Sequence, residues 1–160
     1  MSVISHKYIF IAICAILASC STNTVYHRYY PIEGNGWKRT DTIFFTLNDS
    51  LDTGIYSTKI GVRHTVSYPY RDLWLSVSLP DKEKSDTVHL YLANERGNWN
   101  GNGTASGYYQ YESDGPLFDY REISDSVIKI CHIMKGFILP SITDIGISIS
   151  RSINPEEDKK

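Results

Sequence analysis

Between residues 42 and 152, apolar and polar side chains alternate with a period of two in a series of short runs. Successive side chains of a β-strand point to opposite faces, so this alternation is typical of strands with one buried face and one face in water. Gly, Asn, Asp and Pro residues separate the runs, as expected of turns. The positions expected to face the core are Ile43, Phe45 and Leu47; Ile60, Val62, His64 and Val66; Leu73, Leu75, Val77 and Leu79; Val88, Leu90 and Leu92; and Ile145, Ile147 and Ile149.

Two further segments complete the predicted strands. Residues 108–112 form a short expected strand, whereas the pattern of residues 126–134 fits either a helix or a strand. We favour a strand for residues 126–134 because branched Val and Ile side chains, which suit a pleated surface, are frequent there. Seven or eight short strands with almost no helical periodicity predict an all-β fold. We expect an antiparallel β-sandwich over residues 42–152, with the jelly roll as one candidate topology.

The first 20 residues follow a different pattern. A short polar start precedes an apolar run over residues 8–17, which ends in Leu17-Ala18-Ser19-Cys20. A run of about ten residues is too short to span a bilayer, which takes about 20, and it is typical of a secretory signal peptide. The small residues before Cys20 complete a lipobox, which predicts a signal peptide over residues 1–19 and lipidation of the Cys20 thiol. The alternative is an ordinary signal peptide with a coincidental cysteine.

Residues 20–41 join this predicted anchor to the sandwich. The first few are a short polar spacer, but the remainder is too rich in aromatic and branched side chains to stay in water. We therefore expect a lipidated tether that continues as an ordered, extended arm lying against the domain, with a turn at residues 34–36. At the other end of the chain, we expect residues 153–160 to form a charged, frayed tail.

Composition limits the classes of partner. Removal of residues 1–19 would leave 160 − 19 = 141 residues, enough for one domain, with a net charge of 15 − 18 = −3 because only one Lys is lost. Without a basic run, the chain is not expected to bind nucleic acid, whose phosphates are met by clustered Lys and Arg. Of the three cysteines only Cys131 would remain unmodified. We expect no intrachain disulfide and interpret Cys131 as a small buried apolar residue.

No pattern in the sequence predicts catalysis. Gly-x-Ser-x-Gly, His-Glu-x-x-His and Cys-x-x-Cys are all missing, and no glycine-rich stretch has phosphate-binding spacing. Paired carboxylates for glycoside hydrolysis stay open, because a sequence does not show which acids converge. His64 and His132 fall in alternating strands, where we interpret a lone histidine as a hydrogen-bonded structural residue. We therefore expect no enzyme, no metal site and no cofactor.

Two stretches are rich in residues that often recognise partners. One is a turn between two predicted strands, and the other is a Gly- and Asn-rich loop over residues 94–107. Loops on a rigid sandwich often bind, so both are candidate contact surfaces. The structural alternative is that the tyrosines cover an end of the sandwich and that the tryptophan plugs the core. The candidate residues are Tyr68, Tyr70, Arg71 and Asp72 in the turn and Trp99 in the loop.

Taken in order, several stretches resemble the GldH gliding-motility lipoproteins of the Bacteroidetes. They are the lipobox, VYHRYYPIEGNGWKRTDTIFF, IGVRHTVSYPYRDLWLSVSLP, DTVHLYLANERGNWNGNGTASGYYQ and SITDIGISIS, which together cover nearly the whole chain. The segment at residues 131–135 departs from the family, in which a more polar segment ending in Met-Arg is expected.

The resemblance implies a non-catalytic lipoprotein needed for cell-surface gliding and linked to type IX secretion. Members also occur in organisms that do not glide, so a role in secretion or in the envelope is an expectation alongside motility. Only Cys20 carries over as a functional residue. Residues 21–24 lack the acidic cluster that often sends such lipoproteins to the outer face, so we expect the domain to face the periplasm from the outer membrane.

Two functions are compatible with these observations. In the first, the anchored sandwich docks other envelope lipoproteins or secretion and motility proteins through its aromatic surface. The alternative is a periplasmic or surface glycan-binding module, in which Trp99, Trp37 or Tyr68 stacks on a sugar ring.

Overall fold

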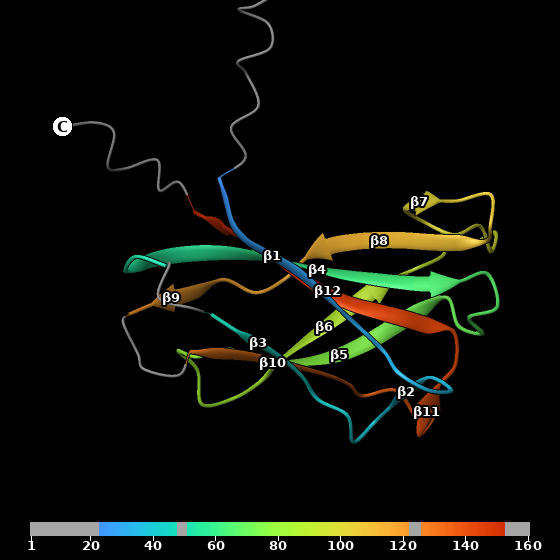
Figure 1. The fold of residues 1–160 in the computed structure, drawn as a ribbon, viewed down its shortest axis with the longest axis horizontal. Coiled ribbons are helices and arrows are strands. Elements are labelled where there is room, and N and C mark those ends of the chain that lie inside the picture. The colour runs from blue at the N-terminus through green and yellow to red at the C-terminus, as the bar shows by residue number, and fades with distance from the viewer. Residues whose placement is uncertain (1–22, 48–50, 122–125, 153–160) are drawn as a thin grey trace, which may run out of the picture.

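A computed structural model describes residues 23–47, 51–121 and 126–152. The predicted signal peptide, the lipobox with Cys20 and the charged tail lie outside these residues. The described chain consists of strands joined by turns, arranged in two main layers (Figure 1). The strands are β1 (Thr24–Pro31), β2 (Trp37–Lys38), β3 (Ile43–Thr46), β4 (Gly54–Thr65), β5 (Asp72–Ser78), β6 (Asp86–Tyr91), β7 (Asn102–Gly103), β8 (Tyr108–Asp114), β9 (Phe118–Tyr120), β10 (Val127–His132), β11 (Ile138–Leu139) and β12 (Ile142–Arg151).

The described part of the chain contains no helix that is long and apolar enough to cross a membrane.

The two layers are antiparallel sheets, which confirms the predicted β-sandwich. The larger sheet has the order β1-β12-β4-β8-β7, with β9 also paired to β4, and the smaller sheet has the order β3-β10-β5-β6. If the eight principal strands β1, β3, β4, β5, β6, β8, β10 and β12 are counted from first to eighth, the sheets read 1-8-3-6 and 2-7-4-5. This is the topology of a jelly roll, in which each sheet is built from strands far apart in sequence. The short strands β2 and β11 pair separately.

The alternating positions fill the space between the sheets, as the pattern predicts. In β4 the side chains of Ile60, Val62 and His64 are fully buried, and the expected positions of β5 and β12 are buried in the same way. Val66 is an exception, because β4 ends at Thr65 and the chain turns away. The Val66 side chain is therefore 57% exposed, and the prediction that it faces the core is wrong.

Residues 127–132 form strand β10, so the strand interpretation of this segment is confirmed over that range. Ile128, Ile130 and His132 are fully buried. Cys131 has the opposite orientation, is free and lies half-buried beside Ser76 of β5. It packs against the outer face of the sheet rather than within the core.

The extended arm expected before residue 42 is part of the larger sheet. Its residues 24–31 form β1, which pairs with β12 from Thr24 opposite Ser150 to Pro31 opposite Asp144. The side chains of Tyr26 and Tyr30 pack against the core. The arm is therefore an edge strand of the sandwich and not a separate segment resting on its surface.

One row across the larger sheet explains how this edge strand is held. Tyr29 of β1 lies opposite Gly146, which pairs with Gly61, which in turn pairs with Glu112 of β8. Because the two glycines carry no side chain, the Tyr29 ring crosses the sheet and its hydroxyl donates a hydrogen bond to the Glu112 carboxylate at 2.8 Å. The Arg63 guanidinium lies 4.2 Å from the centre of the same ring. The Tyr29 ring thereby covers the two glycines on the outer face of this sheet.

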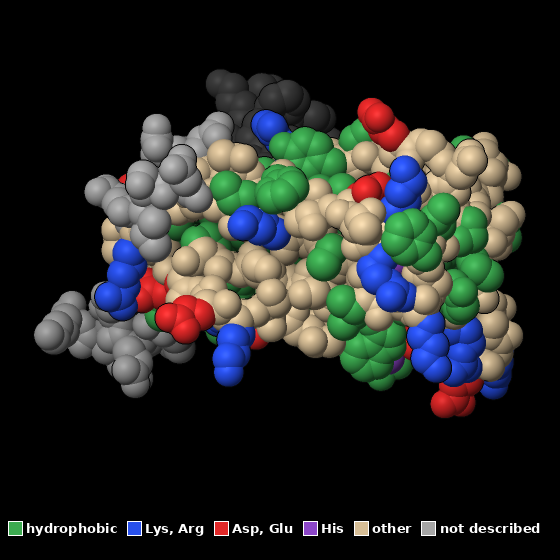
Figure 2. Space-filling model, turned by 90° about the horizontal axis from the view of Figure 1, so that it is seen from below, with side chains coloured by type: hydrophobic (Ala, Val, Ile, Leu, Met, Phe, Trp, Pro, Cys, Tyr) green, Lys and Arg blue, Asp and Glu red, His purple; other side chains and the backbone are tan. Residues whose placement is uncertain are grey.

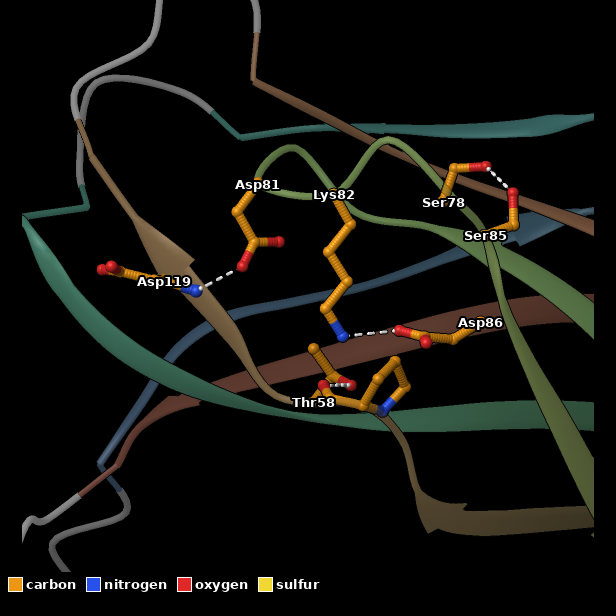
Figure 3. A network of polar contacts seen from close by, with 8 residues as sticks. Thr58, Ser78, Asp81, Lys82, Ser85, Asp86 and Asp119 are labelled. Carbon is orange, nitrogen blue, oxygen red and sulfur yellow. Dashed lines mark hydrogen bonds and ion pairs between the residues drawn. The ribbon is translucent and has the colours of Figure 1, made fainter.

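The sandwich has two ends, which we call the amino end and the far end. The amino end is where β1 and β4 begin and β12 ends, and the far end is where β4 ends and β5 begins. At the amino end the loop between β5 and β6 approaches β9 (Figure 3). There the Asp81 carboxylate accepts a hydrogen bond from the Asp119 backbone N–H at 2.9 Å, and Lys82 pairs with Asp86 at 2.7 Å. The bond between Asp81 and Asp119 connects the two sheets at the amino end, while the pair of Lys82 and Asp86 lies within the loop and the start of β6.

Candidate interaction surface

The predicted turn between β4 and β5 lies at the far end and is built on a buried tyrosine. The Tyr68 side chain is 3% exposed, and its hydroxyl donates to the Asp72 backbone carbonyl at 3.1 Å. Burial, followed by the nearby Asp72 carboxylate, raises the pKa of Tyr68 above its ordinary value. Tyr68 therefore does not offer its ring to a partner, contrary to the expectation of an exposed surface. Instead it supports Tyr70, whose ring meets it edge-on at 5.7 Å.

Trp99 also packs inward. Its ring lies 4.6 Å from the fully buried His64 ring and 6.0 Å from Tyr109. The loop is held by Asn94, whose side-chain oxygen accepts the backbone N–H groups of Arg96 and Asn98. Trp99 is half-buried and packs against the core, so the structure supports the alternative in which it plugs the far end.

The predicted contact residues of the turn that reach solvent are Tyr70, Arg71 and Asp72. Tyr70 is 40% exposed and Arg71 is exposed at the start of β5. The Asp72 carboxylate lies 3.0 Å from Nε2 of His89, on the neighbouring strand β6. Three of the five predicted contact residues therefore share one edge of the far end, while Tyr68 and Trp99 lie beneath it.

The outer face of β5 and β6 continues this exposed edge with a stack of rings. Trp74 and His89 lie directly opposite each other, with ring centres 3.8 Å apart and planes within 11°. Tyr91 follows on β6, with its ring centre 4.0 Å from that of His89. Trp74 is 40% and Tyr91 is 62% exposed. Because Asp72 fixes the His89 ring, the stack is ordered before any partner arrives.

We define the Trp74 surface as Tyr70, Arg71, Asp72, Trp74, His89 and Tyr91 together. The sequence contained a signal for the members that were missed. If Leu73, Leu75 and Val77 face the core, Trp74 must face outward, and His89 and Tyr91 must do the same on β6. What the sequence could not show is that β5 and β6 pair in a register that places Trp74 opposite His89.

A groove of about 270 Å³ lies beside the Trp74 surface. One wall is formed by residues 133–136, directly after β10. There the Met134 sulfur accepts a hydrogen bond from the Trp74 backbone N–H at 3.4 Å. The Arg39 guanidinium donates to the backbone carbonyls of Met134 and Lys135 and so fixes this wall. Figure 2 views the molecule from below Figure 1 and shows hydrophobic side chains gathered with Lys and Arg over one half of the visible face. The groove is lined by Tyr70, Asp72, Trp74, Ile133, Met134, Lys135 and Gly136.

A second hollow, of about 430 Å³, lies on the outer face of the larger sheet. Its charged groups are already engaged, because Arg63 donates to the Gln110 side-chain oxygen at 2.9 Å and lies 3.6 Å from Asp144. Among residues 23–47, 51–121 and 126–152, no three His, Cys, Asp or Glu side chains are placed to hold a metal ion. His64 and His132 bond to the backbone carbonyls of Thr65 and Trp37, as expected of structural histidines.

Comparison with known proteins shows which family this chain belongs to. Residues 24–149 match the family model described as GldH lipoprotein. The gliding motility lipoprotein GldH of Flavobacterium johnsoniae is 27% identical over 156 residues, covering 92% of this chain and 98% of the relative. A GldH homolog of Christiangramia forsetii is 29% identical over 159 residues, covering 92% of this chain and 96% of the relative.

Among solved structures, the coat protein of Tobacco streak virus aligns with a TM-score of 0.27 at 13% identity. The alignment covers 83% of this chain and 93% of the coat protein.

Proposed function

This chain belongs to the GldH lipoprotein family, and we propose that it is a non-catalytic component of the gliding motility and type IX secretion apparatus that acts through protein–protein contacts. Its relatives carry the name gliding motility lipoprotein. The observation that carries the proposal is the Trp74 surface, a rigid and exposed set of rings at the far end of the sandwich, opposite the end where β1 begins. Exposed Trp and Tyr side chains with a neighbouring Arg are the residue types that dominate protein interfaces.

We further propose that Cys20 carries the lipid and that the domain faces the periplasm from the outer membrane. The lipobox supports lipidation, and the lack of acidic residues at positions 21–24 supports the periplasmic orientation. Protease treatment of intact cells tests the orientation. Digestion of the domain before the outer membrane is opened would contradict it.

A crosslinked pull-down from native membranes tests the proposed contacts. We expect the wild-type protein to recover other envelope lipoproteins or secretion and motility proteins, and Cys20→Ser to lose them. Trp74→Ala and Tyr70→Ala should recover several-fold less partner while keeping the wild-type unfolding midpoint. Tyr108→Ala is the matched control, because Tyr108 is 50% exposed but lies on the other sheet. Equal recovery with all three variants would show that the contact surface lies elsewhere.

The glycan-binding alternative loses the three rings that the sequence suggested for it. Trp37 is fully buried, Tyr68 is nearly so and Trp99 is half-buried under its loop, so these rings do not form an open platform. Trp74 beside the groove is the tryptophan that is open for stacking on a sugar. Titration of the protein with peptidoglycan fragments, followed by tryptophan fluorescence, tests it. The absence of a saturable change would remove this alternative, and a change that persists in Trp74→Phe would exclude Trp74 as the stacking ring.

A further inference from the structure

Three exposed apolar side chains lie near the place where the chain joins the fold. Val25 of β1 is 45% exposed, Ile55 of β4 is 44% exposed and Leu117, just before β9, is 54% exposed. Ile55 lies opposite Asp119 of β9, two residues after Leu117. On the other side, the Ile55 backbone carbonyl accepts the N–H of Ser152, directly after β12, which pairs with β1. The three side chains therefore belong to one corner, at the amino end of the larger sheet.

The length of chain before β1 decides what can lie near this corner. Four residue steps separate Cys20 from Thr24, which span at most about 14 Å when fully extended. By contrast, β4 has 12 residues and measures about 40 Å from the amino end to the far end. A lipid on Cys20 therefore holds the amino end at the bilayer, while the far end is beyond its reach unless the whole domain lies flat.

We infer that the corner formed by Val25, Ile55 and Leu117 rests on the lipid surface and fixes the orientation of the domain. This inference rests on the proposed lipidation of Cys20. Apolar side chains that would otherwise be exposed lose water in the interfacial region of the bilayer, which stabilises this contact.

Charges on the same sheet oppose a flat orientation. The centre of its outer face carries Arg63 with Asp144, and Glu112 with the Tyr29 hydroxyl. Pressing this face into lipid would dehydrate these groups, which is costly.

Among the described residues, Asp119 and Arg151 at this corner each have a partner of opposite charge. Arg121 lies 2.6 Å from Asp119, and Arg151 lies 3.9 Å from Asp52. Contact therefore does not require anionic lipid, and we expect it on vesicles of phosphatidylcholine alone, with little dependence on salt.

Fluorescence quenching tests the inference. The mature lipidated protein, purified from membranes, is placed in phosphatidylcholine vesicles whose acyl chains carry bromine near the carbonyl end, which quenches tryptophan on contact. Ile55→Trp places a reporter in the corner, and Leu117→Trp repeats the measurement at a second position. Tyr108→Trp is the control, because Tyr108 is exposed on the same sheet but lies opposite Thr65 at the far end. The wild-type protein gives the background of the three native tryptophans.

We expect the reporters from Ile55→Trp and Leu117→Trp to be quenched several-fold more than that from Tyr108→Trp. Equal quenching at both ends would overturn the inference in favour of a flat domain. No quenching at either end, with the protein attached to the vesicles, would overturn it in favour of a domain held off the lipid. If the wild-type protein does not attach while Cys20 is intact, the proposed lipidation fails as well.

Discussion

At the scale of single residues, two buried histidines make the stability of the fold depend on pH. The rings of His64 and His132 are fully buried, and each has one nitrogen with no hydrogen-bond partner among the described residues. Burial lowers the pKa of both rings, and for His132 the nearby Arg39 lowers it further. Both histidines are therefore neutral in the folded protein at neutral pH, and protonation would place a charge among aromatic side chains.

This predicts that the protein becomes less stable as the pH falls. An unfolded histidine takes up a proton near its ordinary pKa of about 6.5. The folded rings, with lowered pKa values, stay neutral until the pH is lower. Between these two values the unfolded state binds more protons, so the free energy of unfolding is highest above pH 6.5 and decreases below it.

Urea unfolding at pH 7.5 and pH 5.5 checks this expectation. The midpoint should be lower at pH 5.5, and His132→Gln should weaken the dependence on pH. An unchanged midpoint, or a higher one at pH 5.5, would contradict the assignment of neutral buried rings.

The two glycines under Tyr29 give a second prediction at this scale. A Cβ on Gly61 would overlap the Tyr29 hydroxyl, and one on Gly146 would lie 2.6 Å from a ring carbon. Gly61→Ala should therefore displace Tyr29 and destabilise the fold by about 1–3 kcal/mol, as other overpacking does. Removing the ring with Tyr29→Ala in the same chain should recover part of that loss.

Gly136→Ala is the control for Gly61→Ala. Its added Cβ would meet neighbouring atoms only at 3.5 Å or more, which is ordinary contact. Urea unfolding of Gly61→Ala, Tyr29→Ala, the double variant and Gly136→Ala measures the effect, and equal losses from Gly61→Ala in the presence and absence of Tyr29 would contradict the explanation.

At the scale of elements, periodicity predicted the strands that have one wet face. Strands β5 and β12 are long enough for alternation to be visible, and their inward residues were predicted correctly. Elements of two or three residues, such as β7 and β9, carry too few positions to show a period. The arm that became β1 was predicted to be ordered from its aromatic residues, but its pairing with β12 could not be predicted. That pairing joins Thr24 to Ser150, which are far apart in the chain.

The candidate contact surface was predicted only in part, because local sequence shows where aromatic residues gather but not which of them pack inward. Sequence showed that aromatic residues gather between β4 and β5, and Tyr70 is indeed exposed there. It could not show which tyrosine of the pair turns inward. That depends on the hydrogen bond from Tyr68 to the Asp72 carbonyl and on the space left beside Trp99. Local composition predicts that a surface exists, whereas packing decides its members.

The two tryptophans of the far end should differ in their effect on stability. Trp99 packs against His64 and the core, so Trp99→Ala leaves a cavity and should cost about 2–4 kcal/mol of the free energy of unfolding. Trp74 rests on the outside of β5, and Trp74→Ala should cost less than about 1 kcal/mol. Chemical denaturation of both variants measures the difference. A larger loss of stability for Trp74→Ala than for Trp99→Ala would contradict the assignment of Trp99 to the core and Trp74 to the contact surface.

At the scale of the whole molecule, the proposed short tether and the length of the sandwich together determine how far the Trp74 surface lies from the membrane. With the amino end at the lipid, the Trp74 surface lies on the order of 40 Å above the membrane. A partner must reach that height, and a short tether keeps the surface there. This gives the short spacer a function that its own polar sequence does not reveal.

Lengthening the spacer should therefore weaken assembly. Insertion of about 20 Gly and Ser residues between Thr22 and Asn23 leaves the sandwich unchanged but lets the domain sample many heights and orientations. The effective concentration of its surface at a fixed partner falls accordingly. We expect lower recovery in the crosslinked pull-down with an unchanged unfolding midpoint. Full recovery would show that the height of the surface does not matter.

The direction of β1 has a mechanical consequence. If the proposed lipid on Cys20 holds the amino end, β1 begins beside the membrane and runs toward the far end, so a protein that pulls on the Trp74 surface applies tension along the axis of β1. The hydrogen bonds between β1 and β12 are perpendicular to that axis. They are therefore loaded together in shear, from Thr24 to Pro31, instead of opening one after another as in a zipper. Under the proposed anchoring, β1 is thus oriented to transmit force along its length without peeling from the fold.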